Sequence, residues 1–140
     1  MILSYMKLCD NAQSPFKATK NSVGFDLYSP QTIEIPPGSI VVIETNLAFK
    51  FPPLTYGRLA VRSSLAKCGL DILGGVIDPD YTGNVSAILK NHGDKCLMIE
   101  EGQRFVQMIC ESAKFPILKK IPSLQSTTRN QNSFGSSGKY

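Results

Sequence analysis

Short runs of strand-forming residues, separated by proline and glycine turns, recur along most of the chain. β-branched and aromatic residues favour strands, whereas Pro and Gly favour the turns between them. The turns include P-P-G at 36–38 and P-P at 52–53. The runs cover residues 32–35, 40–43, 47–51, 56–62, 85–89 and 105–110. Strands this short, at this spacing, predict an all-β sandwich, jelly roll or barrel.

Local patterns add detail to this expectation. Residues 56–62 alternate between an apolar and a mostly polar face, whereas residues 105–110 alternate less cleanly. One short helical turn is expected, with Ser63 and Ser64 as its caps and Gly69 as its end.

Size and charge narrow the class of protein. A chain of 140 residues, 42% of them hydrophobic, suits one compact core. The net charge of +4 is small, and its lysines and arginines are scattered, which argues against a nucleic-acid partner but suits a polyphosphate ligand. No apolar stretch of about 18 residues and no apolar signal-peptide core is present, so we expect no membrane partner.

The cysteines and the single histidine bear on location and chemistry. The four cysteines are far apart and form no C-x-x-C pair. They therefore favour free thiols in a reducing, intracellular compartment: the cytoplasm or nucleus of a cell or host cell. His92 lies in the turn N-H-G-D at 91–94, where a structural or solvent-facing role is expected. A Ser-His-Asp or Cys-His mechanism and a structural zinc site are thus disfavoured.

The composition changes after Pro122. Residues 123–140 are mostly Ser, Thr, Asn, Gln and Gly. Their only large apolar side chains are Leu124, Phe134 and Tyr140. Such a segment cannot bury enough apolar surface to order itself. We therefore predict a β-barrel domain over residues 1–122 and a flexible arm over residues 123–140.

Five short segments stand out by their order along the chain. They are V-G-F-D-L-Y-S at 23–29, G-R-L-A-V-R-S-S-L-A at 57–66, G-V-I-D-P-D-Y-T-G-N at 75–84, G-Q-R-F-V-Q-M-I at 102–109 and R-N-Q-N-S-F-G-S-S-G at 129–138. Together they resemble the five conserved motifs of the trimeric dUTPase family. The resemblance implies a distorted jelly-roll barrel that forms a homotrimer, with each site shared by three chains. It also implies Mg²⁺-assisted hydrolysis of dUTP to dUMP and pyrophosphate.

The third segment contains D-P-D-Y-T-G, a strong turn signature, so we expect a hairpin tip there. Taken alone, an acid at this position is more often a turn former. The resemblance makes Asp78 the catalytic residue, which holds the attacking water and accepts its proton. It also implies that Tyr81 lies under the deoxyribose and excludes a 2′-hydroxyl. The backbone at Val76, Ile77 and Ser86 would pair with the uracil edge.

The resemblance assigns the phosphate contacts to the second and fourth segments. Arg62 offers a fixed fork of donors, while Ser63 and the N–H of Ser64 would donate from the start of the helical turn. Gln107 would hydrogen-bond a phosphate or the attacking water. Asp26, in the first segment, would contact the Mg²⁺ shell through water, since Mg²⁺ keeps several waters and binds largely to phosphates. Taken alone, these residues also fit a surface arginine, a capping pair and ordinary strand positions.

The fifth segment would give the arm its role. The resemblance implies that Arg129 grips the γ-phosphate and that Phe134 stacks over the uracil. Gly135, Ser136 and Ser137 would wrap the phosphates. The chain contains no G-x-x-x-x-G-K-[ST], so this phosphate cradle is not a P-loop.

Several residues depart from the family pattern. Val61 and Ser64 stand where the family usually has Pro and Gly, and Asn130, Ser133 and Ser137 replace Gly, Gly and Thr. These departures leave open a nucleotide-binding or regulatory protein with weakened catalysis. A dCTP deaminase shares the fold, but that chemistry needs a pocket glutamate, and the expected hairpin contains none.

Overall fold

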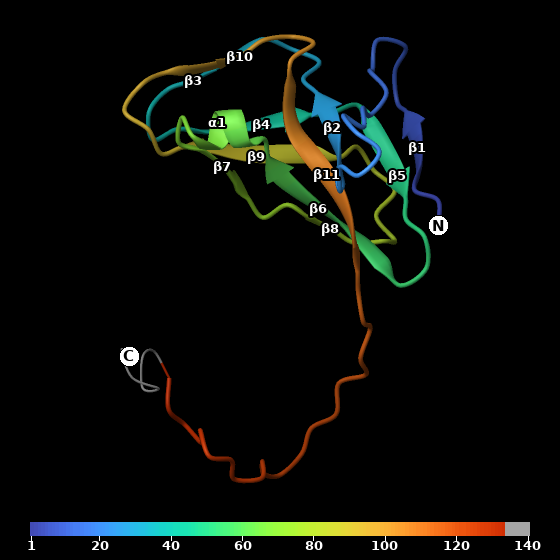
Figure 1. The fold of residues 1–140 in the computed structure, drawn as a ribbon, viewed down its shortest axis with the longest axis vertical. Helices are drawn as coiled ribbons and strands as arrows, with labels where there is room; N and C mark the ends of the chain where they lie inside the picture. Colours follow the sequence, from blue (N-terminus) through green and yellow to red (C-terminus); the bar gives the residue numbers. More distant parts are fainter. Residues whose placement is uncertain (134–140) are drawn as a thin grey trace.

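Antiparallel strands make up nearly all the regular structure of the computed structural model, which describes residues 1–133 (Figure 1). The strands are β1 (Ser4–Lys7), β2 (Gly24–Tyr28), β3 (Ile33–Ile35), β4 (Ile40–Glu44), β5 (Leu47–Lys50), β6 (Thr55–Val61), β7 (Leu70–Leu73), β8 (Val76–Ile77), β9 (Ser86–Asn91), β10 (Leu97–Ile99) and β11 (Arg104–Ser112). Each predicted run falls on a strand, and the all-β prediction is confirmed. Within the described part of the chain, no helix is long and apolar enough to cross a membrane.

Two sheets enclose the core. The larger has the order β2-β11-β6-β8 and the smaller β4-β9-β7, while β1 pairs with β5 and β10 with β3. Alternate side chains of these strands point inward, as the pattern in residues 56–62 predicted for β6. Fully buried members of the core include Leu27, Ile35, Ile43, Leu59, Leu89, Phe105 and Met108.

Strands β1, β2, β7, β8 and β10 lie outside the predicted runs. They are short, and β1 is exposed along its whole length. Their own residues give only a weak strand signal, and each is paired with a neighbouring strand, as β10 is with β3. Tertiary pairing therefore supplies what local propensity lacks.

Helix α1 spans Ser63–Ala66, so the expected helical turn is present. The capping prediction was wrong: Arg62 is the N-cap, and no side chain caps the helix. Arg62 has φ −67° and ψ 143°, so the extended backbone of β6 persists through it and moves both serines into the helix itself. Gly69, at φ 89°, ends the turn as predicted.

The chain changes sheets between β7 and β9. Strand β7 pairs with β9, but β8 crosses over to pair with β6. Gly74 and Gly75 make this crossing at φ 68° and 88°, a left-handed conformation that glycine adopts at little cost. The predicted turn follows β8, closed by an N–H of Tyr81 that donates to the Asp78 carbonyl at 3.0 Å.

A β-bulge lies at the start of β11. Arg104 pairs with Tyr28 but Val106 with Leu27, so the register shifts between them. Phe105 and Val106 are consequently both fully buried, although they are consecutive. The bulge explains the unclean alternation in this segment.

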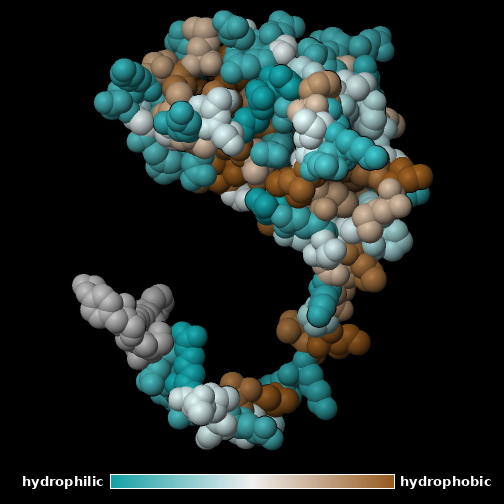
Figure 2. Space-filling view, in the orientation of Figure 1, coloured by the Kyte–Doolittle hydropathy of each residue, from teal (hydrophilic) through white to brown (hydrophobic). Residues whose placement is uncertain are grey.

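Residues 113–133 leave the barrel and form no further strand (Figure 1). The Ala113 N–H donates to the Leu54 carbonyl at 2.9 Å, just after β11 ends. Beyond it, apolar side chains stand exposed along the segment, as the brown patches below the barrel show (Figure 2). They include Phe115, Ile117 and Leu118.

Candidate active site

A cleft of about 210 Å³ lies where β8, the turn after it and the start of β9 meet. It is lined by Val76, Ile77, Asp78, Tyr81, Asn84 and Ser86. All of these except Asn84 were singled out from the sequence. The structure therefore brings together the residues assigned to the attacking water, the sugar and the uracil.

Tyr81 lies across the turn that carries it. Its hydroxyl donates to the Asn84 carbonyl at 2.8 Å, and the residue is 45% exposed. Gly83 makes this position possible, because a Cβ there would lie 2.7 Å from the tyrosine oxygen and 2.8 Å from Cζ. The ring is thus held at its hydroxyl end while about half of its surface is open to a ligand.

Asn84 anchors the turn to the barrel, and sequence reasoning missed it. Its Oδ1 accepts the Asn46 N–H at 2.9 Å, and its Nδ2 donates to Asn46 Oδ1 at 3.1 Å. The next residue, Val85, is buried and donates its N–H to the Leu47 carbonyl at 2.9 Å. The only signal for Asn84 was its place at the end of the third segment.

Asp78 is exposed at this cleft. The turn is closed through the backbone carbonyl of Asp78, so this hydrogen bond does not occupy the carboxylate. A carboxylate beside a half-open pocket can orient a water and accept its proton. The cleft lining includes no glutamate.

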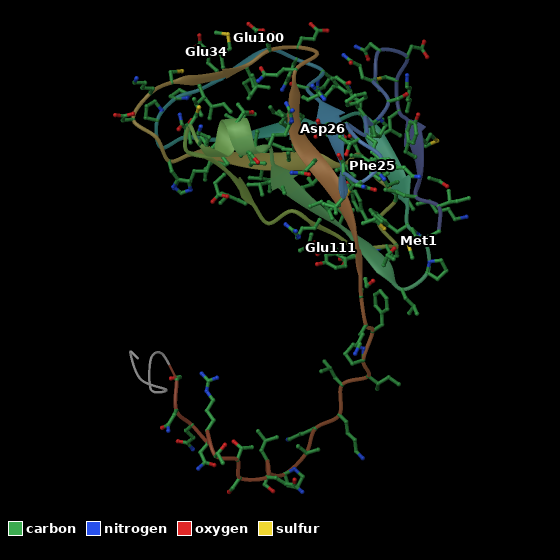
Figure 3. The ribbon with its side chains drawn as sticks, in the orientation of Figure 1. Met1, Phe25, Asp26, Glu34, Glu100 and Glu111 are labelled. Atoms are coloured by element: carbon green, nitrogen blue, oxygen red, sulfur yellow. The ribbon has the colours of Figure 1, made fainter. Side chains whose placement is uncertain are left out.

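A charged cluster lies on the outer face of the larger sheet. Arg62 Nε is 3.3 Å and Arg104 Nη1 is 3.2 Å from the same oxygen, Asp26 Oδ2. Gln107 stands opposite Asp26 in the β2–β11 register. Its side chain lies over Gly24, where a Cβ would be 2.4 Å from Gln107 Oε1. Figure 3 labels Asp26 on β2, beside β11.

The charged cluster therefore unites three predicted residues, Asp26, Arg62 and Gln107, with one that was missed. Arg104 lies in the fourth quoted segment, but the unclean alternation gave no indication of its direction. Ser63 and Ser64 follow Arg62 directly, and both are exposed at the start of α1.

The cleft and the charged cluster are separate within one chain. Arg58, in the middle of β6, pairs with Val76 at the cleft, whereas Arg62 lies four residues further along the chain, just past the end of that strand. Four strand residues measure about 13 Å. Arg129 lies in the extended segment, where its Nε donates to the Asn132 carbonyl at 3.1 Å. Phe134, Gly135, Ser136 and Ser137 lie outside the described residues.

Two expectations about other side chains can be compared with the structure. All four cysteines are free, as predicted. His92 is exposed and its Nε2 lies 3.5 Å from Asp71 Oδ2, apart from both the cleft and the charged cluster. Within residues 1–133 no group of three or more His, Cys, Asp or Glu side chains could hold a metal ion.

Known proteins resemble this chain in sequence and in fold. The dUTPase family profile matches residues 10–138. The deoxyuridine 5′-triphosphate nucleotidohydrolase of variola virus is 41% identical over 134 residues, which cover 96% of this chain and 91% of the relative. The enzyme of the same name from vaccinia virus (strain Copenhagen) is 40% identical over the same length.

Solved structures agree. The Staphylococcus bacteriophage 80alpha dUTPase with dUPNHPP superposes with a TM-score of 0.89 at 28% identity, covering 98% of both chains. A point mutant of the dUTPase from phage phi11 of S. aureus, described with a structural Mg(II) ion, gives 0.81 at 25% identity and covers 90% of this chain and 100% of that one. Because sequence and fold match over nearly the whole length, this chain belongs to the dUTPase family.

Proposed function

We propose that the protein is a dUTP diphosphatase, which hydrolyses dUTP to dUMP and pyrophosphate. The observation that carries this proposal is the cleft that places Asp78 beside Tyr81, in a chain of the dUTPase family. Water attacks the α-phosphorus, a new oxygen–phosphorus bond forms, and the bond to the bridging oxygen breaks. Asp78 orients the water and accepts its proton, and pyrophosphate leaves.

The cleft has the shape and hydrogen-bonding groups for a deoxyuridine. Strand β8 stands at the end of its sheet, paired with β6 on one side, so its other edge presents free peptide groups within the described structure. The N–H and C=O groups of Val76 and Ile77, with those of Ser86 across the cleft, match the donors and acceptors of a uracil edge. Tyr81 packs under the sugar and leaves no room for a 2′-hydroxyl.

The charged cluster and the start of α1 bind the phosphates. Arg62 contributes guanidinium donors, and Gln107 an amide, to the phosphates or the attacking water. The first hydrogen bond inside α1 is donated by Leu65 to the Arg62 carbonyl, at 3.0 Å. The N–H groups of Ser63 and Ser64 precede it, as helix starts require, and so can meet phosphate oxygens.

Mg²⁺ fits this site as an ion held mainly by the substrate. Asp26 is a single carboxylate beside two arginines, so it suits an outer-shell contact better than direct ligation. Both ion pairs use Oδ2, which leaves Oδ1 to accept a hydrogen bond from a Mg²⁺-bound water. When bound, the ion supplies neutralisation of phosphate charge.

A homotrimer would bring the separate parts together. In this arrangement one chain contributes the charged cluster, a second the cleft, and a third the arm with Arg129, Phe134, Gly135 and Ser136. The separation of cleft and cluster supports it. So do Ile117 and Leu118, which are 96% and 97% exposed and would gain by burial against a neighbour. From residue 122 to residue 136 an extended arm reaches about 45 Å, far enough to cross to another subunit.

The partners that this function requires are dUTP and further copies of the chain. Neither nucleic acid nor membrane enters the reaction. The four free cysteines are in keeping with a reducing compartment, the cytoplasm or nucleus of a cell or host cell.

A pyrophosphate-release assay with dUTP and Mg²⁺ tests the proposal directly. UTP and dCTP should be poor substrates. Tight binding of the analogue dUpNHpp without pyrophosphate release from dUTP would instead indicate a regulatory protein with weakened catalysis. Ammonia release from dCTP would indicate a deaminase, although no glutamate lines the cleft.

A further inference from the structure

We propose that Arg104 is a positioning residue for the phosphate end of the site, acting through Asp26 and supported by Phe16. The inference rests on the proposed function, because it concerns how the site binds the triphosphate of the substrate. It arises from three independent features: the bulge in β11, an aromatic platform and the sharing of one carboxylate.

The bulge places the Arg104 side chain on the face of the sheet that carries Asp26 and Gln107. In a regular strand, Arg104 and Gln107 would lie on opposite faces, because side chains alternate with a period of two. The register shift between Arg104 and Val106 removes this opposition. Arg104 therefore lies with Gln107 beside Asp26, a re-aiming that bulges often provide next to active sites.

Phe16 forms a platform for the Arg104 side chain. The Arg104 Cζ lies 4.9 Å from the centre of the Phe16 ring, within the range of a cation–π contact. The backbones of Phe16 and Asp26 exchange two hydrogen bonds: the Phe16 N–H donates to the Asp26 carbonyl at 2.9 Å, and the Asp26 N–H donates to the Phe16 carbonyl at 2.7 Å. One residue thus bridges to Asp26 through its main chain and supports Arg104 through its ring. This arrangement restricts rotation of the guanidinium.

The carboxylate of Asp26 is shared between two cations. Its side chain is 13% exposed, and Arg62 and Arg104 are 32% and 33% exposed, so solvent only partly screens the three charges. Two guanidinium groups and one carboxylate leave one net positive charge. Arg62 also donates Nη1 to the Arg104 carbonyl at 3.2 Å, which fixes its orientation.

The consequence is that Arg62 remains available to a phosphate. Without Arg104, Asp26 would form a one-to-one pair with Arg62, and the positive charge facing the substrate would be neutralised. Arg104 therefore keeps Arg62 oriented but incompletely paired.

The test compares nucleotide with nucleoside binding by calorimetry. Arg104→Gln should weaken binding of dUpNHpp about tenfold, close to the loss of one charge-assisted contact, and raise the KM for dUTP in parallel. Affinity for deoxyuridine, which lacks phosphates, should change by less than about twofold. Equal losses for both ligands would show general structural damage and overturn the inference.

Lys17→Gln is the matched control. It removes the same charge one residue from Phe16, where the Lys17 ammonium lies 5.5 Å over the Phe25 ring. It should leave dUpNHpp affinity within about twofold of the parent. A loss of dUpNHpp affinity as large as that of Arg104→Gln would mean that the change in net charge alone causes the effect, and it would overturn the inference.

A double-mutant cycle separates positioning from direct phosphate contact. In an Asp26→Asn background, Arg104→Gln should cost less than about twofold, because the residue through which Arg104 acts has been altered. A full tenfold loss in that background would mean that Arg104 binds phosphate itself, and the positioning role would be wrong.

Two further variants keep the test informative if Arg104→Gln folds poorly. Arg104→Lys keeps the charge but loses the planar fork, and should still weaken dUpNHpp severalfold. Phe16→Leu keeps the backbone bridge and apolar bulk, and should give a smaller loss of the same kind. Parent-like affinity in both would overturn the inference. Failure of the proposed function would show in the parent itself, as absence of pyrophosphate release from dUTP.

Discussion

The turn that follows β8 is held in place by side chains that also line the cleft. Tyr81 bonds forward to the Asn84 carbonyl, and Asn84 exchanges two hydrogen bonds with Asn46. The proposed function assigns the attacking water to Asp78 and the sugar to Tyr81, and the contacts of this turn fix where these two residues lie. Substitutions there should therefore change chemistry and selectivity more than folding.

Asp78→Asn should lower turnover by ~10²–10⁴, the typical loss for a general base, because an amide cannot accept the proton of the attacking water. Binding of dUpNHpp should remain measurable. Asp80→Asn, an exposed acid in the same turn, is the control and should retain activity. Pyrophosphate release is the measurement, and turnover of the Asp78 variant within about threefold of the parent would remove it from this role.

Tyr81→Ala should narrow the preference for dUTP over UTP. In the proposed site the ring would block an extra hydroxyl, and an overpacking clash of this kind costs roughly 1–3 kcal/mol. Tyr81→Phe keeps the ring and loses only the bond to Asn84, so it should keep most of the preference. The readout is the ratio of the kcat/KM values for dUTP and UTP. An unchanged ratio in the alanine variant would make Tyr81 purely structural.

At the scale of elements, the layout of the site depends on irregular backbone. Gly74 and Gly75 turn the chain from one sheet to the other, and the bulge in β11 turns Arg104 toward Asp26. Between these points, β6 and β11 must stay in register. A side-chain cluster bridges them: Tyr56 donates to Glu111 Oε2 at 2.6 Å, and Arg58 donates to Oε1 at 2.7 and 2.9 Å.

The stabilisation from this bridge should depend on pH. Hydrogen bonds from Arg58 and then Tyr56 lower the pKa of Glu111 from its ordinary 4.5. A lowered carboxyl pKa contributes stability above the unfolded value and loses it as pH falls through the folded value. The hydrogen bond to Glu111 raises the pKa of Tyr56 above 10.0, so its contribution is present below that pH and lost as pH rises through the folded value.

Glu111→Gln tests this pH dependence. The variant should melt slightly below the parent near pH 7, and the difference in Tm should disappear at pH values well below 4.5. The effect is small because both partners are partly exposed. Thermal melts across pH 3–8 give the measurement, and a Tm difference that stays constant over this range would contradict the prediction.

At the scale of the whole molecule, the proposed site draws on parts that lie apart within one barrel. Val76 at the cleft pairs with Arg58 in the middle of β6, whereas Arg62 of the charged cluster lies just past the end of that strand. Residues 113–133 extend away from the barrel (Figure 1). The polar composition of residues 123–140 prevents them from forming a core, yet they contain Arg129 and Phe134. We expect this arm to close over bound nucleotide and exclude water from the phosphates.

Deleting residues 128–140 should therefore leave a folded trimer with nearly unchanged melting behaviour, while turnover collapses. The lost contacts are the charge-assisted bonds of Arg129 and a stacking face at Phe134, the latter worth roughly 1–3 kcal/mol. Light scattering, thermal melts and pyrophosphate release measure the three properties. Near-parental hydrolysis would make the arm dispensable, and loss of assembly would make it a structural clasp.

Some of this protein was predictable because its determinants are local. The repeated strands and turns indicated an all-β sandwich, jelly roll or barrel. The residues of the cleft lie between positions 76 and 86, so the turn signature between them indicated that they are near one another. The caps of α1 were mispredicted because β6 extends its conformation through Arg62, which the local sequence does not reveal. The roles of Asp78, Tyr81, Gln107 and the arm residues stay predictions.

The sequence by itself thus determined the class of fold, the polar arm and the turn with Asp78 and Tyr81, because neighbours along the chain specify each of them. Only the tertiary structure decided the charged cluster. Arg104 and Asp26 are 78 positions apart. They meet because β2 pairs with β11 and because a bulge shifts the register beside them. Strand pairing acts between distant segments, so no local pattern of residues could place these two side chains together.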